Sequence, residues 1–191
     1  MFFRKPLNQL RYPVEGGRAV IEIKVKTFHH LFDQRDPAPF RDKDLDEDAA
    51  EYILMCAQEI SSERVGKLRI FYDEETGVDN VEAVRVGVRS YFELQYQLGS
   101  KKLGAIFSIG FKSLLIGLVL LTMAVLTLIY LETSNGQFLS LFLQQNLLLL
   151  GWVAMWKPIN VFLYDWWPIV DILKIYRRLS EVPIEVIHLR S

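Results

Sequence analysis

Two long apolar runs near the middle of the chain, residues 113–131 and 138–156, constrain its fold more than any other feature. Neither run contains Asp, Glu, Lys or Arg, and only residues 132–137 separate them. A helix rises about 1.5 Å per residue, so each run is long enough to cross a hydrocarbon core of roughly 30 Å. The sequence therefore predicts a transmembrane helical hairpin, with spans over about 109–131 and 138–156.

Basic residues lie before the first run and after the second, and not between the two runs. They are Lys101, Lys102 and Lys112 before the first run, and Lys157, Lys174, Arg177 and Arg178 after the second. The connecting residues 132–137 contain none. Because basic residues beside membrane spans stay in the cytoplasm, we expect both termini to be cytoplasmic and the connecting loop to lie outside.

The polar residues before the hairpin alternate between strand and helix patterns. Residues 19–28 and 67–73 alternate apolar with polar side chains, which is typical of half-buried strands. Between them, apolar residues recur at helical spacing up to Ile60, and either Asp44 or Asp46 can cap the start of this helix. A strand, helix, strand crossover favours two parallel strands in one sheet.

A second helical pattern runs from Asp79 to Leu131 without a proline. It predicts one long helix, or two nearly collinear ones, leaving the polar domain and entering the bilayer. Gly87 and Gly99 are the expected places for a bend.

After the second span, Pro158 predicts a break in the helix, because proline has no amide hydrogen to donate. An amphipathic helix follows, interrupted or kinked at Pro168, and residues 183–189 alternate as a final strand. With both termini on one side of the membrane, this strand can return to the first sheet.

The fold class predicted from these patterns is an α+β membrane protein. A two-helix transmembrane hairpin is inserted in a small cytoplasmic α/β domain with a split sheet, in the order β-α-β-α/TM1-TM2-amphipathic α-β. Residues 1–100 form the N-terminal part of the cytoplasmic domain, residues 101–156 the hairpin, and residues 157–191 the amphipathic interfacial helix and the returning strand.

Aromatic residues gather at the end of the second span. With one lysine, they form a candidate lipid or ligand interface: Trp152, Trp156, Lys157, Tyr164, Trp166 and Trp167. Trp and Tyr collect where a bilayer meets water, so interfacial anchoring is the favoured interpretation. A lipid-headgroup or quinone-like pocket is the alternative.

Three polar amides, Gln144, Gln145 and Asn146, interrupt the outer half of the second span. Amides in hydrocarbon need hydrogen-bond partners, so contacts to the other helix or to another subunit are favoured. Lining a pore is the alternative, although no buried carboxylate, histidine or arginine accompanies them in the span.

Acidic residues are densest over residues 33–51. Such carboxylates can bind a hard cation, but the glycine and glutamate spacing of a calcium loop is missing. Helix capping and solvation are favoured over partner docking, and docking over a cation site. The candidate docking loop contains Phe40, Arg41, Asp42 and Asp44.

No catalytic residue, metal ligand set or cofactor site is predicted. The chain lacks the phosphate loop, dinucleotide, nucleophile-elbow and paired-histidine motifs. His29 and His30 are adjacent and do not share a face, and Cys56, the single cysteine, falls in a predicted helix where a buried thiol is expected. A formal net charge of -1 gives no argument for binding nucleic acid.

Three segments, residues 36–46, 152–158 and 163–168, resemble a family of small bacterial inner-membrane proteins with a two-helix transmembrane hairpin. The resemblance covers most of the chain. It implies a multi-pass protein of the bacterial inner membrane, with an ordered role for the loop and for the Trp-Pro segment, and it carries no activity to transfer.

These observations favour a non-enzymatic integral membrane protein that acts as an assembly, docking or scaffold subunit through its cytoplasmic domain. Membrane lipids and either further copies of the chain or a larger membrane complex are the expected partners. One alternative is a homo-oligomeric channel or transporter formed by pooled hairpins. A second is a lipid- or quinone-binding accessory protein.

Overall fold

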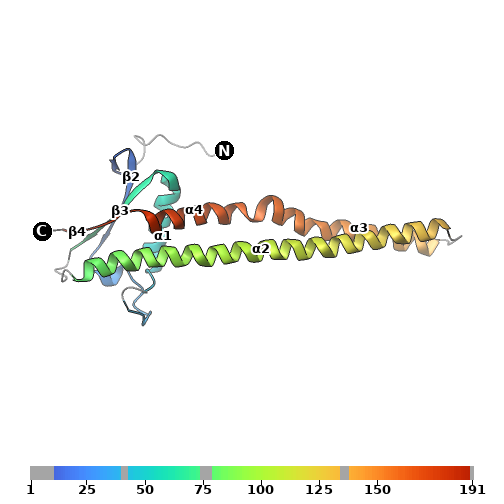
Figure 1. Ribbon diagram of the computed structural model, residues 1–191, viewed down its shortest axis with the longest axis horizontal. Coiled ribbons are helices and arrows are strands. Elements are labelled where there is room, and N and C mark those ends of the chain that lie inside the picture. Colours follow the sequence, from blue (N-terminus) through green and yellow to red (C-terminus); the bar gives the residue numbers. More distant parts are fainter. Residues whose placement is uncertain (1–10, 40–42, 74–78, 134–137, 190–191) are drawn as a thin grey trace. The chain divides into compact units, whose positions relative to one another are not determined.

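The computed structural model describes residues 11–39, 43–73, 79–133 and 138–189 (Figure 1). The elements in chain order are β1 (Val14–Glu15), β2 (Arg18–Val25), η2 (Phe28–His30), α1 (Glu47–Ile60), η3 (Ser62–Arg64), β3 (Val65–Tyr72), α2 (Asp79–Thr133), α3 (Phe138–Asn160), η4 (Val161–Asp165), α4 (Trp167–Glu181) and β4 (Ile184–His188).

The chain divides into two compact units. Met1–Leu98 and Ile172–Ser191 form the first, which we call the sheet unit. Gly99–Asp171 form the second, which we call the helical unit. The chain is thus a mixed α and β structure, with a sheet in one unit and long apolar helices in the other.

The sheet has four strands in the order β1-β2-β3-β4. β2 pairs in parallel with β3, as the crossover pattern predicts, and β4 also pairs in parallel with β3. The last strand of the chain therefore lies in the same sheet as the first ones. β1 was not predicted: it forms an antiparallel hairpin with β2 through Gly16 and Gly17, whose φ angles of 56° and 75° suit glycine.

The core of the sheet unit lies between one face of the sheet and three helical segments. α1, the first turns of α2 and the last turns of α4 supply its helical side, where fully buried side chains include Ile53, Ala57, Val84, Val88, Phe92 and Leu179. The alternation of β2 and β3 places Ile21, Leu68 and Ile70 on the opposite side of this core. Burial of these side chains from water stabilises the unit.

The start of α1 is set by Asp46 rather than Asp44. The side chain of Asp46 accepts a hydrogen bond from the backbone N–H of Asp48 at 3.2 Å. Asp44 serves the preceding loop, where its carbonyl accepts a hydrogen bond from the N–H of Asp33 at 2.9 Å. Of the two capping positions left open by the sequence, the structure uses the later one.

In the helical unit, glycines mark the close contacts between α2 and the antiparallel segment formed by α3 and η4. Added Cβ atoms would lie 2.7 Å from Val161 at Gly110, 2.8 Å from Met155 at Gly117 and 2.6 Å from Leu121 at Gly151. Gly110, Gly117 and the buried Ala124 recur every seventh residue of α2. This spacing keeps one narrow face toward the partner helix and lets the backbones approach closely.

The predicted break at Pro158 is wrong in position, whereas the predicted interruption at Pro168 lies directly before that residue. α3 continues through Pro158 to Asn160, and the irregular segment comes later, as the π-helical turn η4. Pro168 is the second residue of α4, where the missing amide hydrogen has no helical partner to lose. Gly87 and Gly99 both lie inside the single helix α2.

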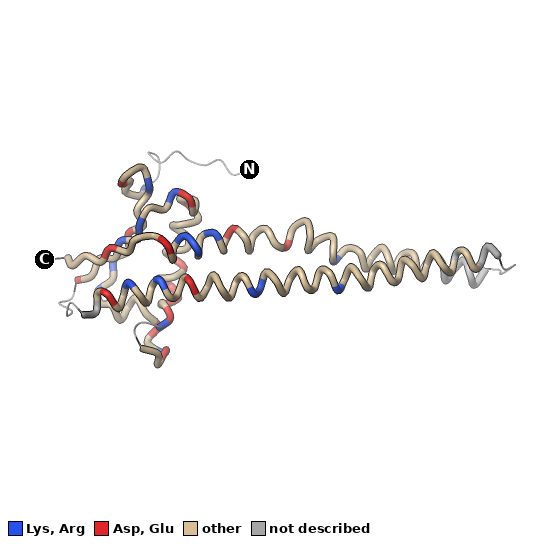
Figure 2. The backbone as a smooth tube through the Cα atoms, in the orientation of Figure 1, with Lys and Arg blue, Asp and Glu red and all other residues tan. Residues whose placement is uncertain are grey.

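Two helical stretches in the described residues, Val81–Thr127 and Gln145–Glu181, are long and apolar enough to cross a membrane. In the most apolar part of each, 17% of the residues are buried. Their apolar side chains therefore point outward, unlike those of a core helix in a soluble protein. Figure 2 shows the long uncharged parts of both helices, whereas charged residues gather on the elements of the sheet unit.

Candidate functional site

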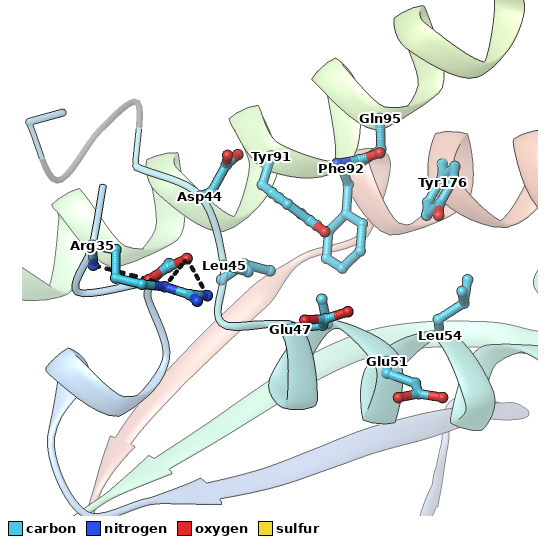
Figure 3. Close-up of a pocket in the computed structure, with 12 residues that line it drawn as sticks. Arg35, Asp44, Leu45, Glu47, Glu51, Leu54, Tyr91, Phe92, Gln95 and Tyr176 are labelled. Atoms are coloured by element: carbon cyan, nitrogen blue, oxygen red, sulfur yellow. Dashed lines mark hydrogen bonds and ion pairs between the residues drawn. The ribbon is translucent and has the colours of Figure 1, made fainter. Parts of the chain in front are cut away.

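The sheet unit contains a cleft of about 460 Å³ lined by the loop before α1, by α1 itself, by α2 and by α4 (Figure 3). Glu47, Glu51 and Leu54 share one face of α1, because helical residues four and three positions apart are neighbours. Tyr91 and Gln95 are related in the same way on α2. The cleft thus has an acidic side and an aromatic side.

The acidic side carries more negative than positive charge. Asp33 is held by Arg35, whose Nε donates to Oδ1 at 2.9 Å and whose Nη2 lies 2.9 Å from Oδ2. The hydrogen bonds from this guanidinium lower the pKa of Asp33. Among the described residues, the carboxylates of Asp44, Glu47 and Glu51 have no ion-pair partner. Among the described lining residues, four carboxylates therefore face a single cation, Arg35, whose pKa is raised by Asp33 first and also by Glu47.

The aromatic side is formed by three rings. Phe92 is fully buried, its centroid lies 6.3 Å from that of Tyr176 in a stacked arrangement, and Tyr91 meets it edge-on at 5.3 Å. Burial raises the pKa of Tyr91 and of Tyr176. Both phenols therefore stay protonated at neutral pH and can donate hydrogen bonds.

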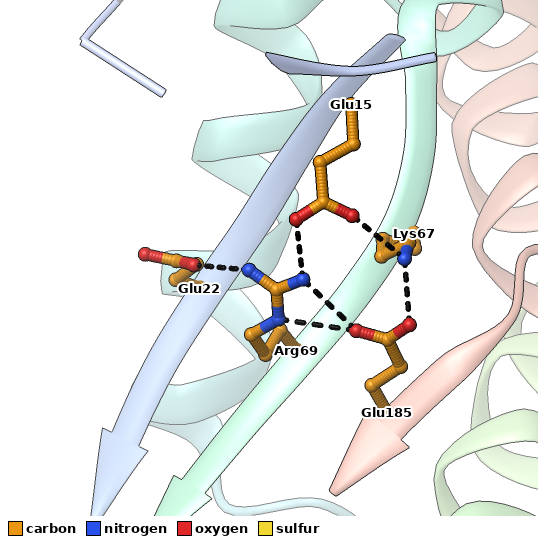
Figure 4. Close-up of polar contacts among 5 residues, drawn as sticks. All are labelled: Glu15, Glu22, Lys67, Arg69 and Glu185. Carbon is orange, nitrogen blue, oxygen red and sulfur yellow. Dashed lines mark hydrogen bonds and ion pairs between the residues drawn. The ribbon is translucent and has the colours of Figure 1, made fainter. Parts of the chain in front are cut away.

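The sheet face opposite the core carries a network of five charged side chains (Figure 4). Arg69 contacts Glu15 at 2.6 Å, Glu22 at 2.8 Å and Glu185 at 3.0 Å, and Lys67 contacts Glu15 at 2.8 Å and Glu185 at 2.6 Å. These residues come from all four strands. The network ties the strands together and fixes their register, which is a structural role.

The network shifts the pKa of four of its members. Hydrogen bonds from Lys67 and then from Arg69 lower the pKa of Glu15 to about 2. The pKa of Glu185 is lowered in the same way by Lys67, and the hydrogen bonds that Glu15 accepts raise the pKa of Arg69 and of Lys67. Glu15, Glu185, Lys67 and Arg69 are therefore charged at neutral pH.

The helical unit contains a second cavity, of about 430 Å³, beside η4. Two members of the candidate lipid or ligand interface, Lys157 and Tyr164, line it. The others do not: Trp152, Trp156 and Trp167 are exposed, and Trp166 donates its indole N–H to the carbonyl of Phe162 at 3.0 Å. Asp165, which with Lys157 flanks the aromatic group in the sequence, lies 3.6 Å from Lys157.

The polar amides of α3 are only partly described. Asn146 donates to the carbonyl of Phe142 at 2.7 Å, which is a hydrogen bond within its own helix. The side chain of Gln145 is exposed, and that of Gln144 lies outside the described part of the structure. The pore and subunit-contact interpretations therefore remain predictions.

The remaining sequence candidates are placed as follows. Asp44 lines the cleft, whereas Phe40, Arg41 and Asp42 lie outside the described residues. His29 and His30 belong to η2, and His30 Nδ1 lies 2.9 Å from the hydroxyl of Thr27. Cys56 is buried. Within the described residues, no group of three His, Cys, Asp or Glu side chains could hold a metal ion.

The cleft and the network were missed at the level of sequence for different reasons. Opposite charges on the outward positions of neighbouring strands, such as Glu22 and Arg69, are a readable signal for the network. The cleft joins Glu47, Tyr91 and Tyr176, which are far apart in the chain. No periodic pattern connects them. Comparison with protein-family models, with curated proteins and with solved structures finds no match for this chain.

Proposed function

We propose that the chain is an integral membrane protein whose two apolar helices hold the sheet unit at the cytoplasmic surface of a bacterial inner membrane, as a docking subunit. The cleft of the sheet unit is the docking site, and its occupant is a basic amphipathic segment of a partner protein. The observation that carries this proposal is the cleft lining, in which the described carboxylates outnumber the one cation and lie beside the buried ring of Phe92 and the half-buried rings of Tyr91 and Tyr176.

The anchoring part of the proposal rests on exposed apolar surface. Leu115 and Leu126 on α2 are 67% and 60% exposed, and Leu149 on α3 is 62% exposed. Apolar surface of this extent on two adjacent helices is favourable in hydrocarbon and costly in water. The basic residues at the ends of the hairpin favour an orientation with the sheet unit in the cytoplasm.

The docking part rests on charge and shape. Asp44, Glu47 and Glu51 attract a cationic partner, while Tyr91 and Tyr176 offer ring surface to an aliphatic or guanidinium group. The volume of the cleft lies within the range of roughly 300–1,000 Å³ that is usual for ligand sites. A segment that carries Lys or Arg beside an apolar anchor satisfies both sides.

The cleft lining also favours binding over chemistry. Its described residues are Asp, Glu, Arg, Gln, Tyr and apolar residues, with no Ser, Thr, Cys, His or Lys among them. A hydroxyl or thiol nucleophile with an adjacent His or Lys base, one usual arrangement for covalent catalysis, is therefore missing from the described lining. We therefore propose a non-enzymatic role.

The test uses the full chain in an uncharged detergent, with two fluorescent peptides as probes. One peptide carries Lys and Leu at amphipathic helical spacing, and the other has Glu in place of Lys. We expect the basic peptide to bind more tightly and to lose affinity as salt is raised, because salt screens exposed charges.

Two double variants locate the site. Glu47→Gln with Glu51→Gln should weaken binding of the basic peptide about 3- to 10-fold, since two partly exposed charge contacts are lost. Asp48→Asn with Glu93→Gln removes the same charge from exposed positions of α1 and α2 outside the lining, and should leave affinity unchanged. Equal weakening by both pairs, or equal binding of the acidic peptide, would refute the docking site.

A further inference from the structure

The cavity beside η4 combines an apolar wall with one charge of each sign. Ile106 and Ile109 of α2, together with Val161 and Pro168, supply the wall. Lys157, Asp165 and the hydroxyl-bearing Tyr164 supply its polar side. All of these residues belong to the helical unit.

The backbone around the cavity departs from regular α-helix. Pro158 cannot donate an amide hydrogen bond to the preceding turn, and the π-helical turn η4 follows at Val161–Asp165. Single π turns within helices are frequent at functional sites. Gly110 allows Val161 to approach α2 closely, because a Cβ there would lie 2.7 Å from a Val161 methyl carbon. One wall of the cavity is therefore held in place by close packing.

The two charges of the cavity form a loose ion pair without a hydrogen bond. Lys157 Nζ and Asp165 Oδ2 are 3.6 Å apart, which is longer than a hydrogen bond, and their side chains are 59% and 39% exposed. An ammonium group has three donors, and a carboxylate has about four acceptor positions. Both groups thus keep hydrogen-bonding capacity for a ligand.

We propose that this cavity binds the headgroup of a zwitterionic aminophospholipid, with the phosphodiester at Lys157 and the primary ammonium at Asp165. Its acyl chains then lie along Ile106 and Ile109. The inference rests on the proposed membrane embedding, which places the exposed Trp156 and Trp167 and the flanking Lys157 at the depth of the headgroups.

The pairing of charges selects among phospholipids. Phosphatidylethanolamine presents an anion and an ammonium with three N–H donors, which match Lys157 and Asp165 together. The trimethylated ammonium of phosphatidylcholine cannot donate a hydrogen bond to Asp165. Phosphatidylglycerol has no cation, so it leaves the carboxylate of Asp165 facing an anionic ligand, which is unfavourable.

The experiment uses the full chain, purified in detergent and equilibrated with equal amounts of these three lipids, with retained lipid measured by native mass spectrometry. Phosphatidylethanolamine should be retained about 3- to 10-fold over each competitor, as one or two partly exposed charge contacts allow. Asp165→Asn should abolish its preference over phosphatidylglycerol, and Lys157→Gln should lower retention of all three.

Control variants and a competitor complete the test. Asp171→Asn and Lys112→Gln change the same kinds of charge at positions outside the cavity lining and should leave retention unchanged. Soluble glycerophosphoethanolamine should compete poorly, because it lacks the acyl chains. Strong competition would assign the cavity to a free headgroup compound instead of a lipid.

Flotation of the chain with liposomes distinguishes failure of the proposed membrane embedding from failure of the lipid site alone. A chain that does not float with liposomes refutes the membrane embedding on which this inference and the proposed function both rest. A chain that floats but retains the three lipids equally, or keeps its preference after Asp165→Asn, refutes the lipid site alone. Circular dichroism and the melting temperature confirm that each variant is folded.

Discussion

The two units use apolar side chains in opposite ways. In the sheet unit, Phe28, Phe32 and Phe92 are at most 2% exposed, so the large rings point into a core. In the helical unit, Leu115 and Leu126 are more than half exposed, and glycines at the helix contact let larger apolar side chains approach closely. The hydrophobic effect stabilises the first arrangement, because burial removes apolar surface from water. Close backbone approach at glycines is the feature of the second, whose outward side chains suit an apolar environment.

The two cavities differ in the same sense. They are similar in volume, about 460 and 430 Å³, but the one in the sheet unit carries a surplus of carboxylates and the one in the helical unit carries one charge of each sign. A charged lining favours a partner of opposite charge. A neutral lining with both signs favours a zwitterion. The volumes of the two cavities therefore do not distinguish their occupants. The balance of charge in the two linings does distinguish them.

The largest loss of unfolding free energy should come from truncating an aromatic ring in the core of the sheet unit. Phe28→Ala removes a side chain that is 1% exposed and whose ring lies 4.5 Å from that of Tyr72. Loss of a buried phenylalanine costs about 3–5 kcal/mol of unfolding free energy, because a cavity is left behind. Denaturant unfolding in detergent, followed by near-ultraviolet circular dichroism, measures it.

The matched variant is Leu126→Ala, at a position that is 60% exposed on α2. Its truncation leaves no cavity, so the unfolding free energy should change by less than about 1 kcal/mol. If both variants lost the same free energy, the outward apolar side chains of the helical unit would be packed against something, and the comparison would fail.

The second largest loss of stability should come from overpacking the close helix contact. Gly151→Leu places a side chain where a Cβ alone would lie 2.6 Å from Cδ2 of Leu121 and 3.4 Å from its backbone nitrogen. Overpacking of this kind costs about 1–3 kcal/mol. The melting temperature in detergent, followed through tryptophan fluorescence, should fall.

Gly104→Leu is the control, since a Cβ at that position meets nothing within 4 Å. Replacing an exposed helical glycine should stabilise the helix by up to about 1 kcal/mol. The two variants are therefore expected to move the melting temperature in opposite directions. A fall for both would mean that any leucine on this hairpin is harmful.

Much of the fold follows from local patterns, whereas the sites do not. The strands β2 and β3, the extent of α2 and the parallel pairing follow from periodicity and chain direction. The seven-residue spacing of Gly110, Gly117 and Ala124 is also a sequence signal, and it could have predicted the close helix contact. The prediction of a helix break at Pro158 is wrong because a helix can continue through proline when the next turn changes its hydrogen bonding, as η4 does. The cleft needs long-range packing that no local pattern encodes.

A smaller effect tests the local rule that starts α1. Asp46→Ala removes the side-chain acceptor for the N–H of Asp48 and should cost about 0.5–2 kcal/mol of unfolding free energy. Asp44→Ala, the other capping position open at the level of sequence, removes no such hydrogen bond and should cost less. Equal losses, measured by thermal unfolding, would show that the cap does not fix the start of the helix.

The smallest effect is the acid sensitivity of the charged network, which belongs to the sheet unit alone. The pKa of Glu15 is lowered to about 2 from a usual value near 4.5, mainly by hydrogen bonds from Lys67 and then from Arg69. A carboxylate with a lowered pKa stabilises the folded state above its usual pKa, and that stabilisation is lost as pH falls through the folded value. Its effect should therefore be full above about pH 5 and fade between pH 4.5 and 2.

Glu15→Gln isolates this contribution. The variant should melt below the native chain at pH 6, and the difference between the two melting temperatures should shrink as pH falls toward 2. The difference should be modest, because the Glu15 side chain is 43% exposed and water screens its ion pairs. It should also shrink in 1 M salt, where the screening length is only about 3 Å. A difference that stayed constant from pH 6 to pH 2 would mean that Lys67 and Arg69 do not hold this carboxylate, and that backbone pairing alone joins β1 to the rest of the sheet.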